Sequence, residues 1–68
     1  MKELFEIPYS SYYGDAIVVK LRHPPDPKKW VRIPQDPGIK FKVDWESGWL
    51  SLPLSVVGTT VEVEYFKR

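Results

Sequence analysis

The chain has no cysteine, no asparagine, and one residue each of histidine, glutamine and methionine among its 68 residues. Without cysteine it can form no disulfide, no thiolate metal site and no cysteine nucleophile. It also lacks a run of about 18 apolar residues, which is what a membrane-spanning helix requires. Residues 1–6 are too acidic and too interrupted for a signal peptide. We therefore expect a cytoplasmic protein with no membrane partner.

Residues that commonly carry catalysis are also scarce. His23 is the only histidine, and its position directly before two prolines fits an ordinary loop residue. Asp44 and Glu46, like Glu62 and Glu64, are spaced two residues apart, which places each pair on one strand face, as on an ordinary solvated surface. No serine lies in a nucleophile elbow, and the four glycines are isolated. We therefore predict no enzyme activity, no metal and no cofactor.

Aromatic residues and prolines are abundant instead. Three Trp, four Tyr and three Phe supply bulky packing material, and seven prolines stiffen the chain. At this length only about 60% of the unfolded surface is buried on folding, so the chain forms one domain, residues 1–68, of limited stability. Many loop prolines and few thermolabile residues are typical of heat-adapted proteins, so we also predict a thermostable domain.

Alternating apolar and polar residues predict strands at residues 2–9, 16–23, 30–33, 39–46, 49–54 and 59–66. Residues 10–15, with Tyr12 and Tyr13, are predicted as a loop, and so are the proline-rich residues 23–29. Residues 55–58 form at most one helical turn. The chain is therefore predicted to be all-β, as a small five- or six-stranded antiparallel barrel or a two-sheet sandwich. It matches SH3-like and OB-like barrels in size and has no substantial helix.

The sequence of residues 39–54 indicates how its two predicted strands pair with each other. A two-residue loop at 47–48 sets Trp45 opposite Leu50 and Val43 opposite Leu52, with every apolar residue on one face. A three-residue loop would turn the leucines of the second strand to the wrong face. We therefore predict the tight turn, which points Trp45 inward and Trp49 outward.

The net charge of +1 conceals an uneven distribution. Residues 20–42 carry seven basic and two acidic residues, a net charge of +5, whereas residues 1–19 and residues 43–68 each have a net charge of −2. A basic middle between acidic ends permits a one-sided positive patch.

Aromatic rings beside lysine and arginine on a β surface can bind nucleic acid, because the cations contact phosphates and the rings stack on bases or wedge between them. The leading hypothesis is therefore a nucleic-acid-binding module for DNA or RNA. Its candidate residues are the phosphate contacts Arg22, Lys28, Lys29, Arg32, Lys40 and Lys42 and the rings Trp30 and Trp49. In the structural alternative, Lys40 and Lys42 pair with Glu62 and Glu64 on an adjacent strand, and both tryptophans belong to the core.

Two further hypotheses use the exposed aromatic residues differently. Pro8, Val18, Trp49 and Phe66 could form an apolar patch that docks on a protein partner or builds a homodimer, which would add core to so small a domain. Sugar binding on Trp and Tyr platforms is the third hypothesis.

Residues 52–63, with the sequence LPLSVVGTTVEV, resemble a pattern of swapped-hairpin transcription factors and antitoxins, Leu/Ile-Pro followed by Val-x-Gly-x-x-Val-x-Val. The resemblance implies a dimeric β protein that binds DNA through basic residues. Leu54 and Ser55 stand where those proteins carry basic residues near the proline.

Overall fold

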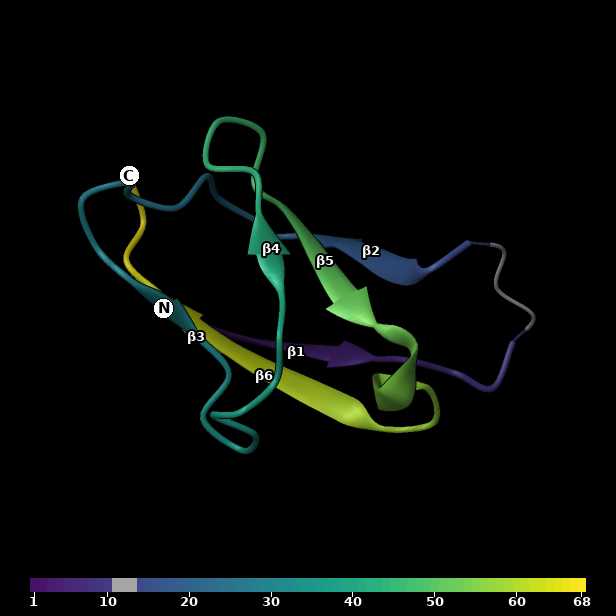
Figure 1. The fold of residues 1–68 in the computed structure, drawn as a ribbon. Helices are drawn as coiled ribbons and strands as arrows, with labels where there is room; N and C mark the ends of the chain where they lie inside the picture. Colours follow the sequence, from purple (N-terminus) through teal and green to yellow (C-terminus); the bar gives the residue numbers. More distant parts are fainter. Residues whose placement is uncertain (11–13) are drawn as a thin grey trace.

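The computed structural model describes residues 1–10 and 14–68, and six strands form two three-stranded antiparallel sheets in it (Figure 1). Sheet A has the order β1-β6-β3, with β1 at Lys2–Glu6, β6 at Thr60–Tyr65 and β3 at Val31–Arg32. Sheet B has the order β2-β5-β4, with β2 at Ala16–Lys20, β5 at Trp49–Pro53 and β4 at Lys42–Val43. One short 3₁₀ helix, η1 at Leu54–Val56, leads from β5 towards β6.

The all-β prediction is confirmed, and the two sheets do not join into a closed barrel. Within the described residues, no helix has the length and the hydropathy needed to cross a membrane. The loop predicted at residues 10–15 includes residues 11–13, among them Tyr12 and Tyr13, which lie outside the described residues.

The core lies between the sheets because alternation turns one face of each strand inward. β6 contributes Val61, Val63 and Tyr65, and β5 contributes Leu50 and Leu52, all of them buried. Burying a side chain of this kind stabilises a fold by about 1.5–3 kcal/mol. These residues form the centre of the core.

The connection between β4 and β5 is longer than the predicted tight turn. Val43 pairs with Leu50 and not with Leu52, and the N–H of Asp44 donates to the carbonyl of Trp49 at 2.8 Å, so residues 45–48 form the loop. Trp45 consequently lies in this loop and not in the strand. The predicted turn and its register are wrong.

The side chain of Asp44 explains the longer turn. Its carboxylate accepts hydrogen bonds from the backbone N–H groups of Glu46 at 3.1 Å and Ser47 at 3.3 Å, and Gly48 has a φ of 81°. An aspartate that binds the backbone two and three residues later stabilises a turn, and alternation cannot reveal this local interaction. The register shifts by two residues, which is the side-chain period of a strand, so Leu50 still points inward and Trp49 still points outward.

A polar cluster joins the sheets at one end. The hydroxyl of buried Tyr65 donates to the carboxylate of Glu3 in β1, and the same carboxylate accepts the backbone N–H of Arg22, just after β2, at 3.0 and 3.1 Å. The N–H of His23 donates to the Tyr65 hydroxyl at 3.3 Å. Burial and the hydrogen bond to Glu3 raise the pKa of Tyr65 to about 12. The cluster fixes β1 and β6 of sheet A to the chain that leaves sheet B.

Candidate functional site

The outer face of sheet B carries basic, aromatic and small apolar side chains. Alternation points Val18 and Lys20 of β2, Trp49 of β5 and Lys42 of β4 away from the core. Trp49 is 44% exposed and Val18 is 53% exposed. The Nζ of Lys20 lies 5.7 Å from the centroid of the Trp49 ring. Together with Lys40, these residues are called the lysine–tryptophan face below.

Lys40 precedes β4 and lies beside Lys42 along an open hollow of about 400 Å³. Ser51 and Pro53 of β5 and Asp15 before β2 also line this hollow. It forms because β4 is only two residues long, so the chain before it diverges from β5. The lysines therefore border a recess, with one carboxylate, that of Asp15, at its rim.

The three lysines of this face make no ion pair with any part of the chain that the structure describes, because the salt bridges there all involve Lys2 or Arg32. Lys42 stands opposite Ser51. The alternative in which Lys40 and Lys42 pair with Glu62 and Glu64 is wrong, because β4 and β6 belong to different sheets.

The outer face of sheet A is neutralised internally. Glu64 of β6 binds Lys2 of β1 at 3.5 Å and Arg32 of β3 at 2.7 Å, and Lys2 also lies 3.9 Å from Glu62. The hydrogen bond from Arg32 is the main reason why the pKa of Glu64 is lowered. The charge of Arg32 is therefore already compensated.

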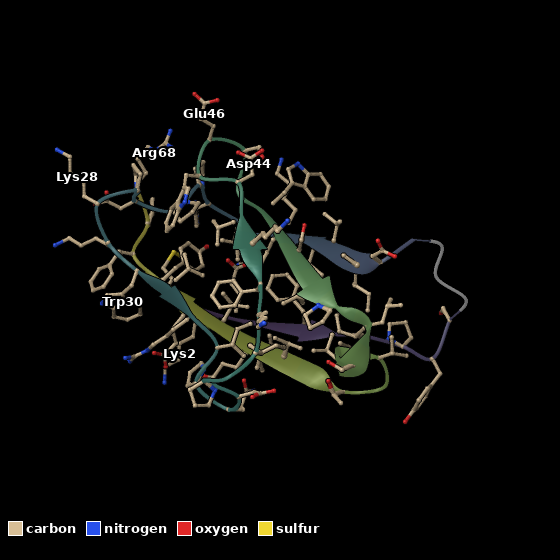
Figure 2. The ribbon with its side chains drawn as sticks, viewed as in Figure 1. Lys2, Lys28, Trp30, Asp44, Glu46 and Arg68 are labelled. Carbon is tan, nitrogen blue, oxygen red and sulfur yellow. The ribbon has the colours of Figure 1, made fainter. Side chains whose placement is uncertain are left out.

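A second aromatic cluster lies where the proline-rich loop meets the end of the chain. Trp30 and Phe66 pack edge to face, with ring centroids 4.8 Å apart. The guanidinium of Arg32 lies 4.2 Å from the Trp30 ring, and the Nζ of Lys29 lies 5.6 Å from the Phe66 ring. Figure 2 shows Trp30 on the same side of the molecule as Lys28, whose side chain extends into solvent. This cluster already contains its own cations.

The candidate residues thus fall into three places. Lys40, Lys42 and Trp49 lie on or beside the outer face of sheet B, whereas Lys28, Lys29, Trp30 and Arg32 gather around β3 of sheet A. Because the sheets pack through their inner faces, their outer faces point away from each other, so Trp30 and Trp49 do not share one surface. The third place is the polar cluster, where the backbone of Arg22 is bound to Glu3.

Lys20 belongs to the lysine–tryptophan face, but it was not among the candidate residues predicted from the sequence. Its alternation with Val18 was visible, but its place beside Trp49 depends on the pairing of β2 with β5. That pairing joins strands separated by two others in the sequence, and no local pattern indicates it.

The apolar patch proposed for self-association is not continuous. Phe66 packs on Trp30 near sheet A, whereas Val18 and Trp49 lie on the outer face of sheet B. Within the described residues, no three carboxylate or histidine side chains gather as metal ligands would.

No protein-family model, curated protein or solved structure matches the chain significantly. The segment that resembles swapped-hairpin proteins forms the end of β5, η1 and the first part of β6, and this resemblance assigns the chain to no family. Any function must therefore be inferred from the residues of the site itself.

Proposed function

We propose that the protein binds nucleic acid, without catalysis, through the lysine–tryptophan face of sheet B. One observation supports the proposal: Lys20 lies over the exposed ring of Trp49, Lys42 and Lys40 follow on the same side of sheet B, and none of the three has an ionic partner among the described residues. Lysines that contact phosphates release counterions from the nucleic acid, which favours binding. The three lysines outnumber the two carboxylates that border the face, Asp15 and Asp44, whereas the charges on sheet A are paired with one another.

The arrangement favours a duplex over a single strand. Proteins that bind single strands usually stack successive bases on several rings, whereas this face offers one ring, Trp49, with Val18 nearby. Lys20 and Lys42 lie on the strands either side of β5, two strand spacings apart and offset by two residues along the strand, so their backbones are about 12 Å apart. Their side chains can reach phosphates on both edges of a minor groove about 6 Å wide, with an apolar wedge between them.

The test is a titration of one labelled DNA sequence, as duplex and as single strand, at several salt concentrations. We expect the logarithm of the duplex affinity to fall with the logarithm of salt concentration with a slope of about −2 to −3, because each neutralised phosphate contributes about −0.9. Loss of the Trp49 contact is worth about 1–3 kcal/mol, so Trp49→Ala should weaken binding roughly 5- to 150-fold.

Two matched variants serve as controls. Trp30→Ala removes an indole that is as exposed as Trp49, and Lys28→Ala removes one lysine charge away from the proposed face. Both should bind as the wild type does, whereas Trp49→Ala and Lys42→Ala should bind more weakly. No binding at low salt, or equal losses for the control and test variants, would refute the proposed site.

A further inference from the structure

The outer edge of β1 bonds to no other strand in the part of the chain that the structure describes. β1 is an edge strand of sheet A. Met1 and Tyr65 exchange backbone hydrogen bonds, and the N–H of Ile7 donates to the carbonyl of Thr59 at 2.9 Å. Bonded pairs alternate in an antiparallel ladder, so the odd-numbered residues of β1 bond to β6.

The backbone N–H and C=O groups of Lys2, Leu4 and Glu6 therefore point to the open edge. No backbone group of residues 1–10 or 14–68 binds them there. Their side chains lie on the outer face of sheet A, where Leu4 is 70% exposed between one basic and one acidic neighbour. Exposure of a large apolar side chain on a free strand edge is typical of a surface that pairs with another strand.

We propose that β1 pairs antiparallel with β1 of a second copy of this chain and forms a two-fold symmetric dimer centred on Leu4. In this register Leu4 contacts Leu4 of the second copy, and Lys2 stands opposite Glu6 on both sides of the centre. Three residue pairs then form, and each exchanges two backbone hydrogen bonds. The two copies of sheet A become one continuous sheet.

The sequence of β1 selects this register over its neighbours. A shift by two residues sets Leu4 opposite Lys2 or Glu6, which loses the apolar contact and at least one charge pair. A shift by one residue brings in backbone groups that already bond to β6. Pro8 has no backbone N–H and so limits the ladder at one end.

The inner face of β1 is compatible with the pairing. In the same register Phe5 stands opposite Glu3 of the second copy. The Glu3 carboxylate is already bound by the Tyr65 hydroxyl and the backbone of Arg22, so the dimer leaves no new carboxylate without a partner. Phe5 is partly buried in the monomer, and the second copy would cover it further.

The dimer does not depend on the proposed function, but it has a consequence for it. The two-fold axis of an antiparallel strand pair is perpendicular to the sheet, so both copies of sheet A face one way. Both lysine–tryptophan faces then point in the opposite direction, on one side of the dimer. Two such faces could engage one duplex together, which raises apparent affinity without new contacts.

The test is sedimentation of the full chain from micromolar to millimolar concentration, with charge-swapped variants. Lys2→Glu and Glu6→Lys each place like charges opposite one another, so we expect each to weaken the dimer at least tenfold. The double variant K2E/E6K restores opposite charges in the same places and should dimerise as the wild type does. Because Lys2 also binds Glu64 within one chain, recovery in the double variant distinguishes pairing between copies from a change in monomer stability.

Amide hydrogen exchange gives a second readout on the same protein. The N–H groups of Leu4 and Glu6 should exchange slowly only at concentrations where the dimer forms, whereas those of Glu3 and Phe5 should be protected throughout. Leu54→Lys, at an exposed leucine away from β1, is the control and should leave the dimer intact, while Leu4→Lys should abolish it. A strict monomer at millimolar concentration, or a K2E/E6K variant as weak as either single variant, would overturn the proposal.

Discussion

Replacement of Tyr65 by Phe tests whether the polar cluster holds the two sheets together. The ring of Tyr65 is buried, and its hydroxyl donates to Glu3 and accepts the N–H of His23. A hydrogen bond to a charged group contributes about 1.5–3 kcal/mol. Since Glu3 retains the backbone N–H of Arg22, we expect the free energy of unfolding to fall by about 2 kcal/mol. For a domain of this size, this loss corresponds to a melting temperature lower by roughly 8–16 °C.

The matched control is Tyr9→Phe, because Tyr9 is 87% exposed and loses the same atom. Its unfolding free energy should change by less than about 0.5 kcal/mol. Urea denaturation of both variants and the wild type at pH 7 provides the comparison. If Tyr65→Phe costs no more than Tyr9→Phe, the cluster does not stabilise the fold as argued.

The pH dependence of stability gives a second test of the role of the Tyr65 hydroxyl. The pKa of Tyr65 rises from about 10 in the unfolded chain to about 12 in the folded protein, so the unfolded chain loses its proton first. The stabilisation is therefore complete below pH 10 and is lost as the pH rises through 12. The stability difference between wild type and Tyr65→Phe should shrink over this interval, because only the wild type has the phenolic proton whose hydrogen bond is lost. A difference that stays constant to pH 12 would contradict the role of the phenolic proton.

Three further predictions concern other parts of the chain. Gly58 has a φ of 80°, and a Cβ there would lie 2.1 Å from Cζ of Tyr9. Gly58→Ala should therefore lower the free energy of unfolding by about 1–2 kcal/mol. The control is Gly38→Ala, where a Cβ would meet no atom closer than 3.9 Å, and it should change the free energy of unfolding by less than about 0.5 kcal/mol. Because Arg32 lowers the pKa of Glu64, the stabilisation by this ion pair is present above pH 4.5 and is lost at lower pH. The midpoint of urea unfolding should therefore change less between pH 7 and pH 3 for Glu64→Gln than for the wild type. Calorimetry should give a melting temperature above about 65 °C, the upper end for mesophilic domains, and a value near 50 °C would exclude heat adaptation.

Alternation in the sequence was sufficient to identify which side of β5 is buried. It placed Leu50 and Leu52 inside and Trp49 outside, and these positions survive an error of two residues in register because the strand period is also two. It did not give the ends of the strands. Residues 39–46 alternate throughout, but only Lys42 and Val43 pair, because the Asp44 side chain starts the turn early and the chain before β4 diverges from β5.

The positive face could not be located by counting charges along the chain, because the basic segment of residues 20–42 is divided between the sheets. β3 pairs with β6, which brings Arg32 to Glu64, 32 residues away, whereas β4 pairs with β5, which brings Lys42 to Ser51. The chain therefore leaves sheet A after Arg32 and enters sheet B at Lys42. What distinguishes the two outer faces is the position of the acidic residues: the central strand of sheet A, β6, carries Glu62 and Glu64, whereas the carboxylates beside sheet B, those of Asp15 and Asp44, lie outside its strands. The charge available to a polyanion is thus set by which strands pair, and that is a property of the fold and not of any one segment.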